Sequence, residues 1–215
     1  MTEKRFRSSD MKMIEQIFLT MTEHLIRYGV IDVEGKSIET LTKEILEYFR
    51  ESNSKVDKPS FIVLYHTKDL LNTAWSYHKE QNYEYAFLFY ATWFEHWING
   101  LIASAASRRG MEEKEIEKII RYNNLKEKTT QQLKLLGLPP LNSRHLKTMT
   151  KIAENRNAFV HYKWQSININ NDRGEYKQLL INIEKTIKYF QTFERKFIFG
   201  KMKKSQLRKA LSIPK

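Results

Sequence analysis

The sequence predicts an all-α protein with a packed core. Two observations indicate the helices and a third the core. The chain has 215 residues but only seven Gly and four Pro, so long stretches contain no helix-breaking residue. Apolar residues recur at helical spacing through most of the chain. Hydrophobic residues make up 41% of the sequence, which is enough to build a real core. We therefore expect a helical bundle of four to five helices preceded by an N-terminal helical hairpin.

Two amphipathic segments predict the N-terminal hairpin. Residues 11–28 place apolar side chains on one helical face, and a turn over 29–36 follows. Ser37 is a suitable N-cap for a second, short helix. The polar stretch 50–58 then ends at Pro59 and is the best linker in the chain. The breaks divide the chain into a hairpin over 1–55, a bundle over 56–199 and a basic tail over 200–215.

The first three helices of the bundle follow the linker in order. The first is expected over about 60–81. The second, over 83–108, is apolar nearly all round and so belongs at the centre of the bundle. The third, over 112–136, is interrupted and ends at Gly137, before the Pro139-Pro140 pair.

Two further helices complete the bundle. Asn142 or Ser143 caps a helix that reaches about Trp164. Residues 165–174 are predicted as a loop with room for a brief extended piece. A last amphipathic helix is expected over 175–199.

Composition narrows the classes of function. The absence of Cys excludes disulfides and Cys-based zinc or redox sites. The longest apolar stretch, 85–94, is well short of the roughly 18 residues of a membrane span. The N-terminus has no apolar signal-peptide core. We expect a soluble, cytoplasmic protein that does not associate with a membrane.

The net charge of +12 lies mostly near the C-terminus. Residues 185–215 contain ten Lys and Arg against Glu194 alone. A terminal basic segment favours a polyanionic partner such as nucleic acid, although a solvated tail has the same composition. The tail residues that we assign to RNA binding are Lys201, Lys203 and Lys204.

The stretch over 154–164 carries the only arrangement that suggests chemistry. It contains Arg-Asn-x-x-x-His late in a predicted helix, as Arg156, Asn157 and His161. Asn157 and His161 are four residues apart and share a helical face. Arg156 lies about 140° from His161 around the helix, so only its long side chain could bring the guanidinium to the same site. The motif offers a titratable imidazole, an orienting amide and a permanent cation.

Those groups can cleave RNA with neither metal nor cofactor. His161 would take the proton of a 2′-hydroxyl, whose oxygen attacks the adjacent phosphorus. Arg156 would neutralise charge on the phosphoryl oxygens. The products are a 2′,3′-cyclic phosphate and a 5′-hydroxyl, and DNA cannot react. The alternative for an isolated motif is structural, with Arg156 a surface ion and His161 an ordinary histidine that has its hydrogen bonds satisfied.

The Arg-Asn-x-x-x-His string resembles the signature of the HEPN superfamily, which consists of small bundles of four to five helices. The resemblance covers about residues 61–199, with an aromatic-rich helix pair, a connecting segment, the motif helix and a closing helix. It implies a metal-independent endoribonuclease, of a kind that often acts as a toxin or in abortive-infection antiviral defence. It also implies a homodimer with a composite active site lined by two motifs.

Carried onto this chain, the resemblance makes Arg156, Asn157 and His161 the catalytic candidates. It adds Glu95, since family members often place a polar or acidic residue on the second helix beside the Arg. A buried Glu is costly unless it is paired, so we expect a contact between Glu95 and Arg156. The alternative for Glu95 is a helix edge that faces solvent. His96 and Asn99 on the same helix are weaker candidates.

The residues after the motif bear on substrate and control. Tyr162, Lys163 and Trp164 are candidates for RNA contact, two of them by base stacking. Some related toxins carry a Tyr two places after the His, where modification silences them. Lys163 occupies that position here, which argues against this control. Control would come from a neutralising or activating protein partner, from dimerisation or from the N-terminal hairpin.

Two other functions are consistent with the sequence. One is a non-catalytic HEPN-like module that binds RNA, a nucleotide or a protein. The other is a helical scaffold or antitoxin whose basic tail is merely solvated.

Overall fold

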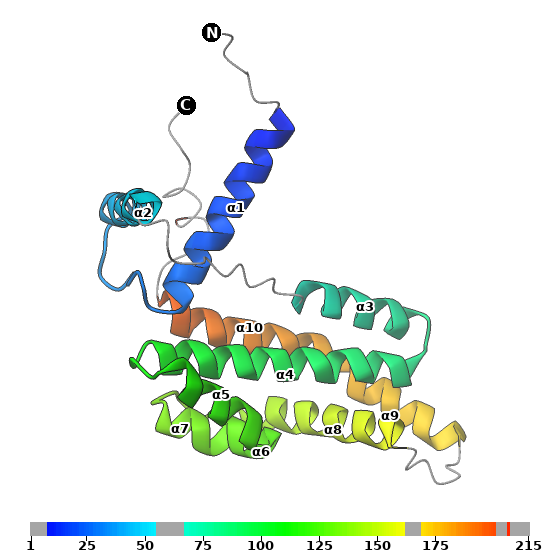
Figure 1. The fold of residues 1–215 in the computed structure, drawn as a ribbon. Helices are drawn as coiled ribbons and strands as arrows, with labels where there is room; N and C mark the ends of the chain where they lie inside the picture. The colour runs from blue at the N-terminus through cyan, green and yellow to red at the C-terminus, as the bar shows by residue number, and fades with distance from the viewer. Residues whose placement is uncertain (1–7, 55–66, 162–168, 201–205, 207–215) are drawn as a thin grey trace. The chain divides into compact units, whose positions relative to one another are not determined.

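The computed structural model describes residues 8–54, 67–161, 169–200 and 206, and every regular element in these ranges is helical (Figure 1). The all-α prediction is therefore confirmed. The chain divides into two compact units. The larger is Leu64–Glu194, and the smaller combines Met1–Val63 with Arg195–Lys215. No helix in the described ranges is both long and apolar enough to cross a membrane.

The smaller unit contains α1 (Ser8–Arg27) and α2 (Ile38–Ser54), at the two places predicted. Its buried hydrophobic residues are Leu19, Leu25, Ile26, Ile31, Val33, Leu41, Ile45 and, from the last turn of the closing helix, Ile198. The predicted linker is wrong over residues 50–54, which continue α2. The segment 50–58 contains neither Gly nor Pro. A polar composition alone does not end a helix.

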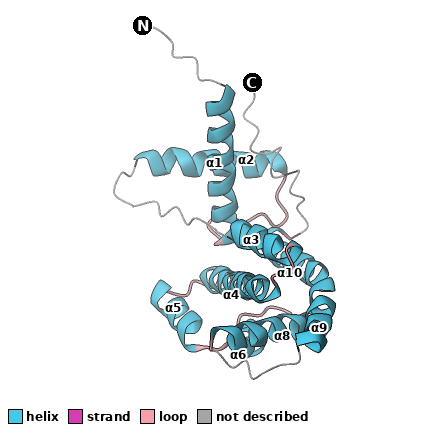
Figure 2. Cartoon of the chain, turned by 90° about the vertical axis from the view of Figure 1, so that its right-hand side faces the viewer, coloured by secondary structure: helices cyan, strands magenta, loops and turns pink. Residues whose placement is uncertain are grey.

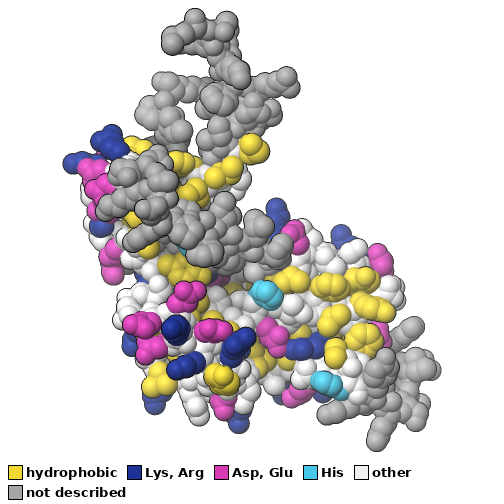
Figure 3. Space-filling model, viewed as in Figure 1, with side chains coloured by type: hydrophobic (Ala, Val, Ile, Leu, Met, Phe, Trp, Pro, Cys, Tyr) yellow, Lys and Arg dark blue, Asp and Glu magenta, His cyan; other side chains and the backbone are white. Residues whose placement is uncertain are grey.

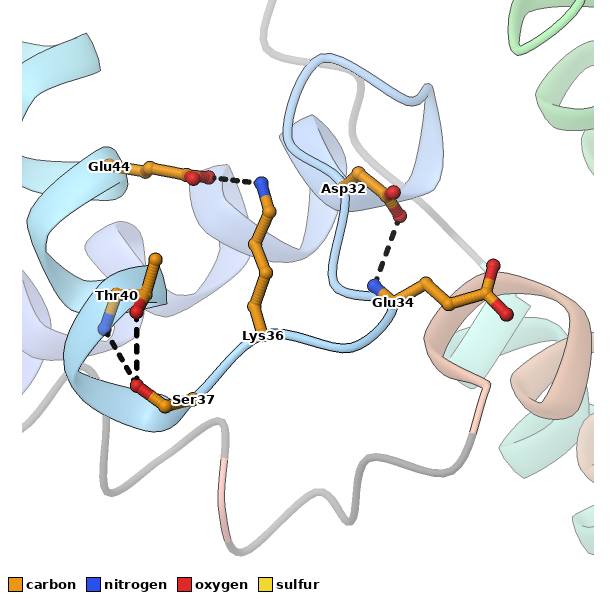
Figure 4. Close-up of polar contacts among 6 residues, drawn as sticks. All are labelled: Asp32, Glu34, Lys36, Ser37, Thr40 and Glu44. Carbon is orange, nitrogen blue, oxygen red and sulfur yellow. Dashed lines mark hydrogen bonds and ion pairs between the residues drawn. The ribbon is translucent and has the colours of Figure 1, made fainter.

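Ser37 caps α2 as predicted. Its Oγ accepts the backbone N–H of Thr40 at 3.1 Å (Figure 4). The neighbouring Lys36 Nζ lies 2.6 Å from Glu44 Oε2 on the second turn of the helix. The cap satisfies one of the free N–H groups at the helix start, and the ion pair ties the preceding turn to it.

The larger unit is built around α4 (Tyr83–Ser107). Figure 2 looks along this helix and shows other helices around most of it. They are α3 (Thr67–Lys79), α5 (Glu113–Tyr122), α8 (Ser143–Val160), α9 (Ile169–Ile181) and α10 (Ile183–Phe199). Trp97 of α4 packs on Phe190 of α10 with 4.4 Å between ring centroids. The predicted burial of this helix is confirmed over most of its circumference, while one face, which carries Tyr85 and His96, is exposed.

The third predicted helix is interrupted, as expected. After α5 come the short α6 (Leu125–Glu127), a π-helical turn η1 (Lys128–Gln132) and α7 (Leu133–Leu135). The restart is a capping box, in which the Asn124 side chain accepts the Glu127 N–H at 3.0 Å and the Glu127 carboxylate accepts the Asn124 N–H at 2.8 Å. Gly137, with φ +67°, ends the segment.

We predict that Gly137→Ala lowers the free energy of unfolding by about 1–2 kcal/mol, because a Cβ is disfavoured at positive φ. The added Cβ would also meet Arg109 Nη2, whose guanidinium donates to the Leu135 carbonyl at 2.9 Å. Gly100→Ala in α4 is the control. It has open space around a Cβ, and we expect it to raise stability by about 0.5–1 kcal/mol. Urea unfolding of both variants tests this, and equal effects would contradict it.

Two predictions are wrong around α9. The predicted loop 165–174 is helical from Ile169 onward. The single helix predicted over 175–199 is two helices that part at Asn182. The Asn182 carbonyl accepts the Thr186 N–H at 3.1 Å, which starts α10, and its side-chain Oδ1 faces Arg144 Nη2 at 3.4 Å. Packing holds α9 despite Gly174, since Tyr176 contacts Phe87 of α4 at 5.0 Å between ring centroids.

The fold should lose stability in mild acid. Burial lowers the pKa of His24, His78 and His145 below the ordinary value of 6.5. A histidine with a lowered folded-state pKa contributes stability above pH 6.5, and this is lost as pH falls through its folded pKa. We expect His78→Gln to reduce the loss of unfolding free energy between pH 7.5 and 5.5. Identical pH profiles for wild type and variant would disprove the assignment.

Candidate active site

The motif helix α8 contacts the central helix α4 through an ion pair. Arg156 Nη2 donates to Glu95 Oε1 at 2.5 Å. The Arg156 side chain is 24% exposed and the Glu95 side chain 45%. The predicted contact is therefore present. Glu95 is less buried than its apolar neighbours suggest, so its carboxylate meets both water and the guanidinium.

The sequence places both partners through helix periodicity. On α8, Met149, Ile152 and Ala153 are buried. Arg156 lies four residues after Ile152 and three after Ala153, so it shares their face of the helix. On α4, Glu95 lies between buried residues, and Asn99 follows one turn later. The ion pair thus lies at the edge of the apolar contact between α4 and α8.

Lys128 of η1 is a third charged member that the sequence did not reveal. Burial lowers the pKa of Lys128, and the Glu95 carboxylate opposes that lowering. Glu95 therefore has two cations within electrostatic range, Arg156 and Lys128. We call these three residues the Glu95 cluster. No spacing rule connects a lysine of the broken segment to α4, so only the fold could identify it.

Polar atoms near the Glu95 cluster are buried without a hydrogen-bond partner among the described residues. They include Arg156 Nε and Asn99 Oδ1. Asn155 Nδ2, next along α8, is in the same state. A buried polar atom left without any partner costs about 1–3 kcal/mol, so these atoms favour a water or ligand partner.

Asn157 and His161 are not brought to the Glu95 cluster. The helix ends at Val160, not at Trp164 as predicted, and His161 is its C-cap. The His161 N–H donates to the Asn157 carbonyl at 3.0 Å, so the two remain on successive turns. Both side chains are exposed, and neither hydrogen-bonds to another residue that the structure describes. His161 lies about 7.5 Å beyond Arg156 along the axis.

The residues predicted to contact RNA form a separate group. Tyr162, Lys163, Trp164, Lys201, Lys203 and Lys204 lie outside the described residues. His96 is exposed on α4 and is not a member of the Glu95 cluster.

A row of aromatic side chains leads to the end of α8, and the sequence analysis missed it. Phe159 contacts Tyr85 edge-on, with 5.5 Å between ring centroids. Tyr85 stacks on Tyr77 at 5.2 Å, and Tyr77 stacks on Phe89 at 5.6 Å. We call Tyr77, Tyr85, Phe89 and Phe159 the aromatic row. Figure 3 shows hydrophobic side chains gathered over this part of α3 and α4, beside intermingled charges.

The aromatic row is open to solvent next to the motif. Tyr85 is 48% exposed, and Phe159 is two residues from His161. The signal in the sequence was the spacing of Tyr85 and Phe89, which share a face of α4. This spacing did not stand out, because aromatic residues occur all along α4.

No protein-family model, curated protein or solved structure matches this chain. The resemblance to the HEPN superfamily therefore stays a prediction from the motif and the order of helices.

Proposed function

We propose that the protein is a metal-independent endoribonuclease that cuts RNA through attack of a 2′-hydroxyl on the adjacent phosphorus. The observation that supports this most is the Arg156–Glu95 pair, which holds a guanidinium partly exposed on the motif helix. His161 is the C-cap of the same helix five residues later, and its imidazole is exposed. The reaction requires a fixed cation and an accessible base at one site. Because Arg156 and His161 of one copy do not meet, we propose that motifs from two copies complete that site.

Each residue has a role in the proposed reaction. His161 takes the 2′-hydroxyl proton as the O2′–P bond forms and the P–O5′ bond breaks, and the 5′ oxygen takes a proton from water. Arg156 donates to the phosphoryl oxygens with the guanidinium N–H groups that Glu95 does not use. Asn157 orients the imidazole or the substrate. Lys128 adds positive charge beside the same carboxylate.

We place this activity in the cytoplasm as a toxin or antiviral-defence effector that acts as a homodimer. The exposed positions of Asn157 and His161 at the end of α8 support a shared cleft, since a second copy can reach them. The basic tail would supply further RNA affinity, and a neutralising or activating protein would restrain the enzyme.

The aromatic row would stack RNA bases next to His161. We expect Tyr85→Ala to weaken binding of a single-stranded RNA about 5- to 100-fold, the effect of one lost base–aromatic stack. Tyr85→Phe should retain affinity, because the ring stacks without its hydroxyl. Fluorescence anisotropy with a 2′-O-methyl oligonucleotide measures both without cleavage. Wild-type affinity in Tyr85→Ala would remove the row from the RNA site.

A non-catalytic module that binds RNA, a nucleotide or a protein is the second candidate. It is favoured by the His161 ring, which has no orienting hydrogen bond to any residue described. Catalytic bases are generally oriented by a third group. A module of this kind would bind RNA with strong salt dependence and leave it intact.

A pair of matched substrates separates the two candidates. The proposed nuclease cuts an all-RNA oligonucleotide in EDTA and leaves the same sequence intact when each 2′-hydroxyl is replaced by hydrogen. The binding module leaves both intact. Cleavage of the 2′-deoxy strand would exclude the proposed chemistry, because that strand has no internal nucleophile.

A further inference from the structure

A separate pocket lies in the larger unit, where the first turns of α8 and α10 meet. Its volume is about 220 Å³, and its lining residues are Arg144, His145, Asn182, Lys185 and Thr186. Arg144 is twelve residues before Arg156 on the same helix, about 18 Å away along the axis. The pocket is therefore distinct from the Glu95 cluster and from His161.

The charge of the pocket is positive. Arg144 and Lys185 line it, and no carboxylate is among its lining residues. Glu184, next to Lys185 in the chain, is not a lining residue; its charge opposes the lowering of the His78 pKa by burial and adds to the raised pKa of Tyr90. The N-terminal ends of α8 and α10 add partial positive charge from their backbone N–H groups.

Two polar side chains of the pocket, His145 and Thr186, are held in place before any ligand arrives. His145 Nδ1 lies 2.9 Å from the Thr186 hydroxyl, which is 1% exposed. The His145 ring stacks on Tyr189 at 4.4 Å, and the Tyr189 hydroxyl accepts the Asn142 N–H at 2.8 Å. Side chains fixed in this way lose little entropy on binding, which favours a ligand of defined geometry.

The only hydrogen bond between lining residues that involves a cation is long. Arg144 Nη2 lies 3.4 Å from Asn182 Oδ1, so the guanidinium can turn toward a better acceptor. A planar guanidinium, an ammonium, an imidazole and a hydroxyl together match an oxyanion with several acceptor oxygens. A phosphate group has that chemistry and fits the volume with room for part of an attached group.

We infer that the pocket formed by Arg144, His145, Asn182, Lys185 and Thr186 binds a phosphate group. Two sources supply one, a backbone phosphate of RNA and a small phosphorylated molecule such as a nucleotide. The inference stands without the proposed nuclease activity, because binding at this pocket involves neither cleavage nor the motif residues.

Calorimetry on the full chain at constant ionic strength tests the pocket. The probes are inorganic phosphate, adenosine 5′-monophosphate and a 2′-O-methyl RNA oligonucleotide, with adenosine as the unphosphorylated control. Arg144→Gln/Lys185→Gln removes the two pocket cations. Lys147→Gln/Lys188→Gln removes the same charge from exposed positions on the same two helices.

We expect the pocket double variant to lose about tenfold in phosphate or nucleotide affinity for each cation removed, while the control double variant stays near wild type. If RNA binding weakens with it, the phosphate is supplied by the RNA backbone. If RNA binding is unchanged, the ligand is a small phosphorylated molecule.

Two results overturn the inference. One is equal loss in both double variants, which would mean general electrostatics. The other is wild-type protein that binds none of the three probes. Circular dichroism checks that the variants fold, and Lys185→Gln alone replaces the double variant if Arg144 proves necessary for folding.

Discussion

Replacing His161 by Ala is expected to lower the rate of RNA cleavage by about 10²- to 10⁴-fold, the usual contribution of a general base. His161 is exposed and caps α8 only through its backbone, so the variant should keep the wild-type fold. Single-turnover rates with end-labelled RNA measure the effect. His96→Ala is the control, because His96 is exposed on α4 outside the Glu95 cluster and should retain the rate. Equal activity of His161→Ala and wild type would remove His161 from the mechanism.

Replacing Arg156 by Gln should cost about 10²- to 10³-fold in the same assay, because it removes the donor to the developing phosphoryl charge. Glu95→Gln should cost about tenfold, since a weaker hydrogen bond would still hold the guanidinium. Arg121→Gln is the matched control. It removes an arginine from an exposed pair with Glu117, at 3.2 Å, and should leave the rate unchanged.

A double-mutant cycle decides how Glu95 acts. If Glu95 only positions Arg156, the double variant will be no slower than Arg156→Gln alone. Fully additive losses would show that Glu95 meets the substrate independently.

Sequence periodicity was sufficient where a helix is defined by its own residues. The central helix α4 followed from its continuous apolar surface, and the start of α8 from Asn142, whose side chain accepts the Arg144 N–H. The stop at Gly137 followed from the freedom of glycine at positive φ. The Arg156–Glu95 contact was expected from the HEPN resemblance, which implies a polar or acidic residue beside the motif arginine, and from the cost of burying an unpaired carboxylate.

Periodicity failed where tertiary contacts decide. Residues of α9 were assigned to a loop because Asn, Asp and Gly favour turns, but packing of Tyr176 on α4 holds them in a helix. The Asn182 side chain at the break contacts Arg144 of α8, which no local pattern indicates. Lys128 comes within electrostatic range of Glu95 only because the interrupted segment 125–135 folds back beside α4. The proposed phosphate pocket combines residues about 40 positions apart in the sequence. Such juxtapositions have no local signature.

The most direct test of the proposed function is the chemistry of the product ends. Wild type and His161→Ala are incubated in EDTA with RNA labelled at one end, and the new termini are identified. We predict cleavage by wild type only, with 2′,3′-cyclic phosphate and 5′-hydroxyl termini. Cleavage that EDTA abolishes, or products that carry 5′-phosphates, would contradict the proposed mechanism.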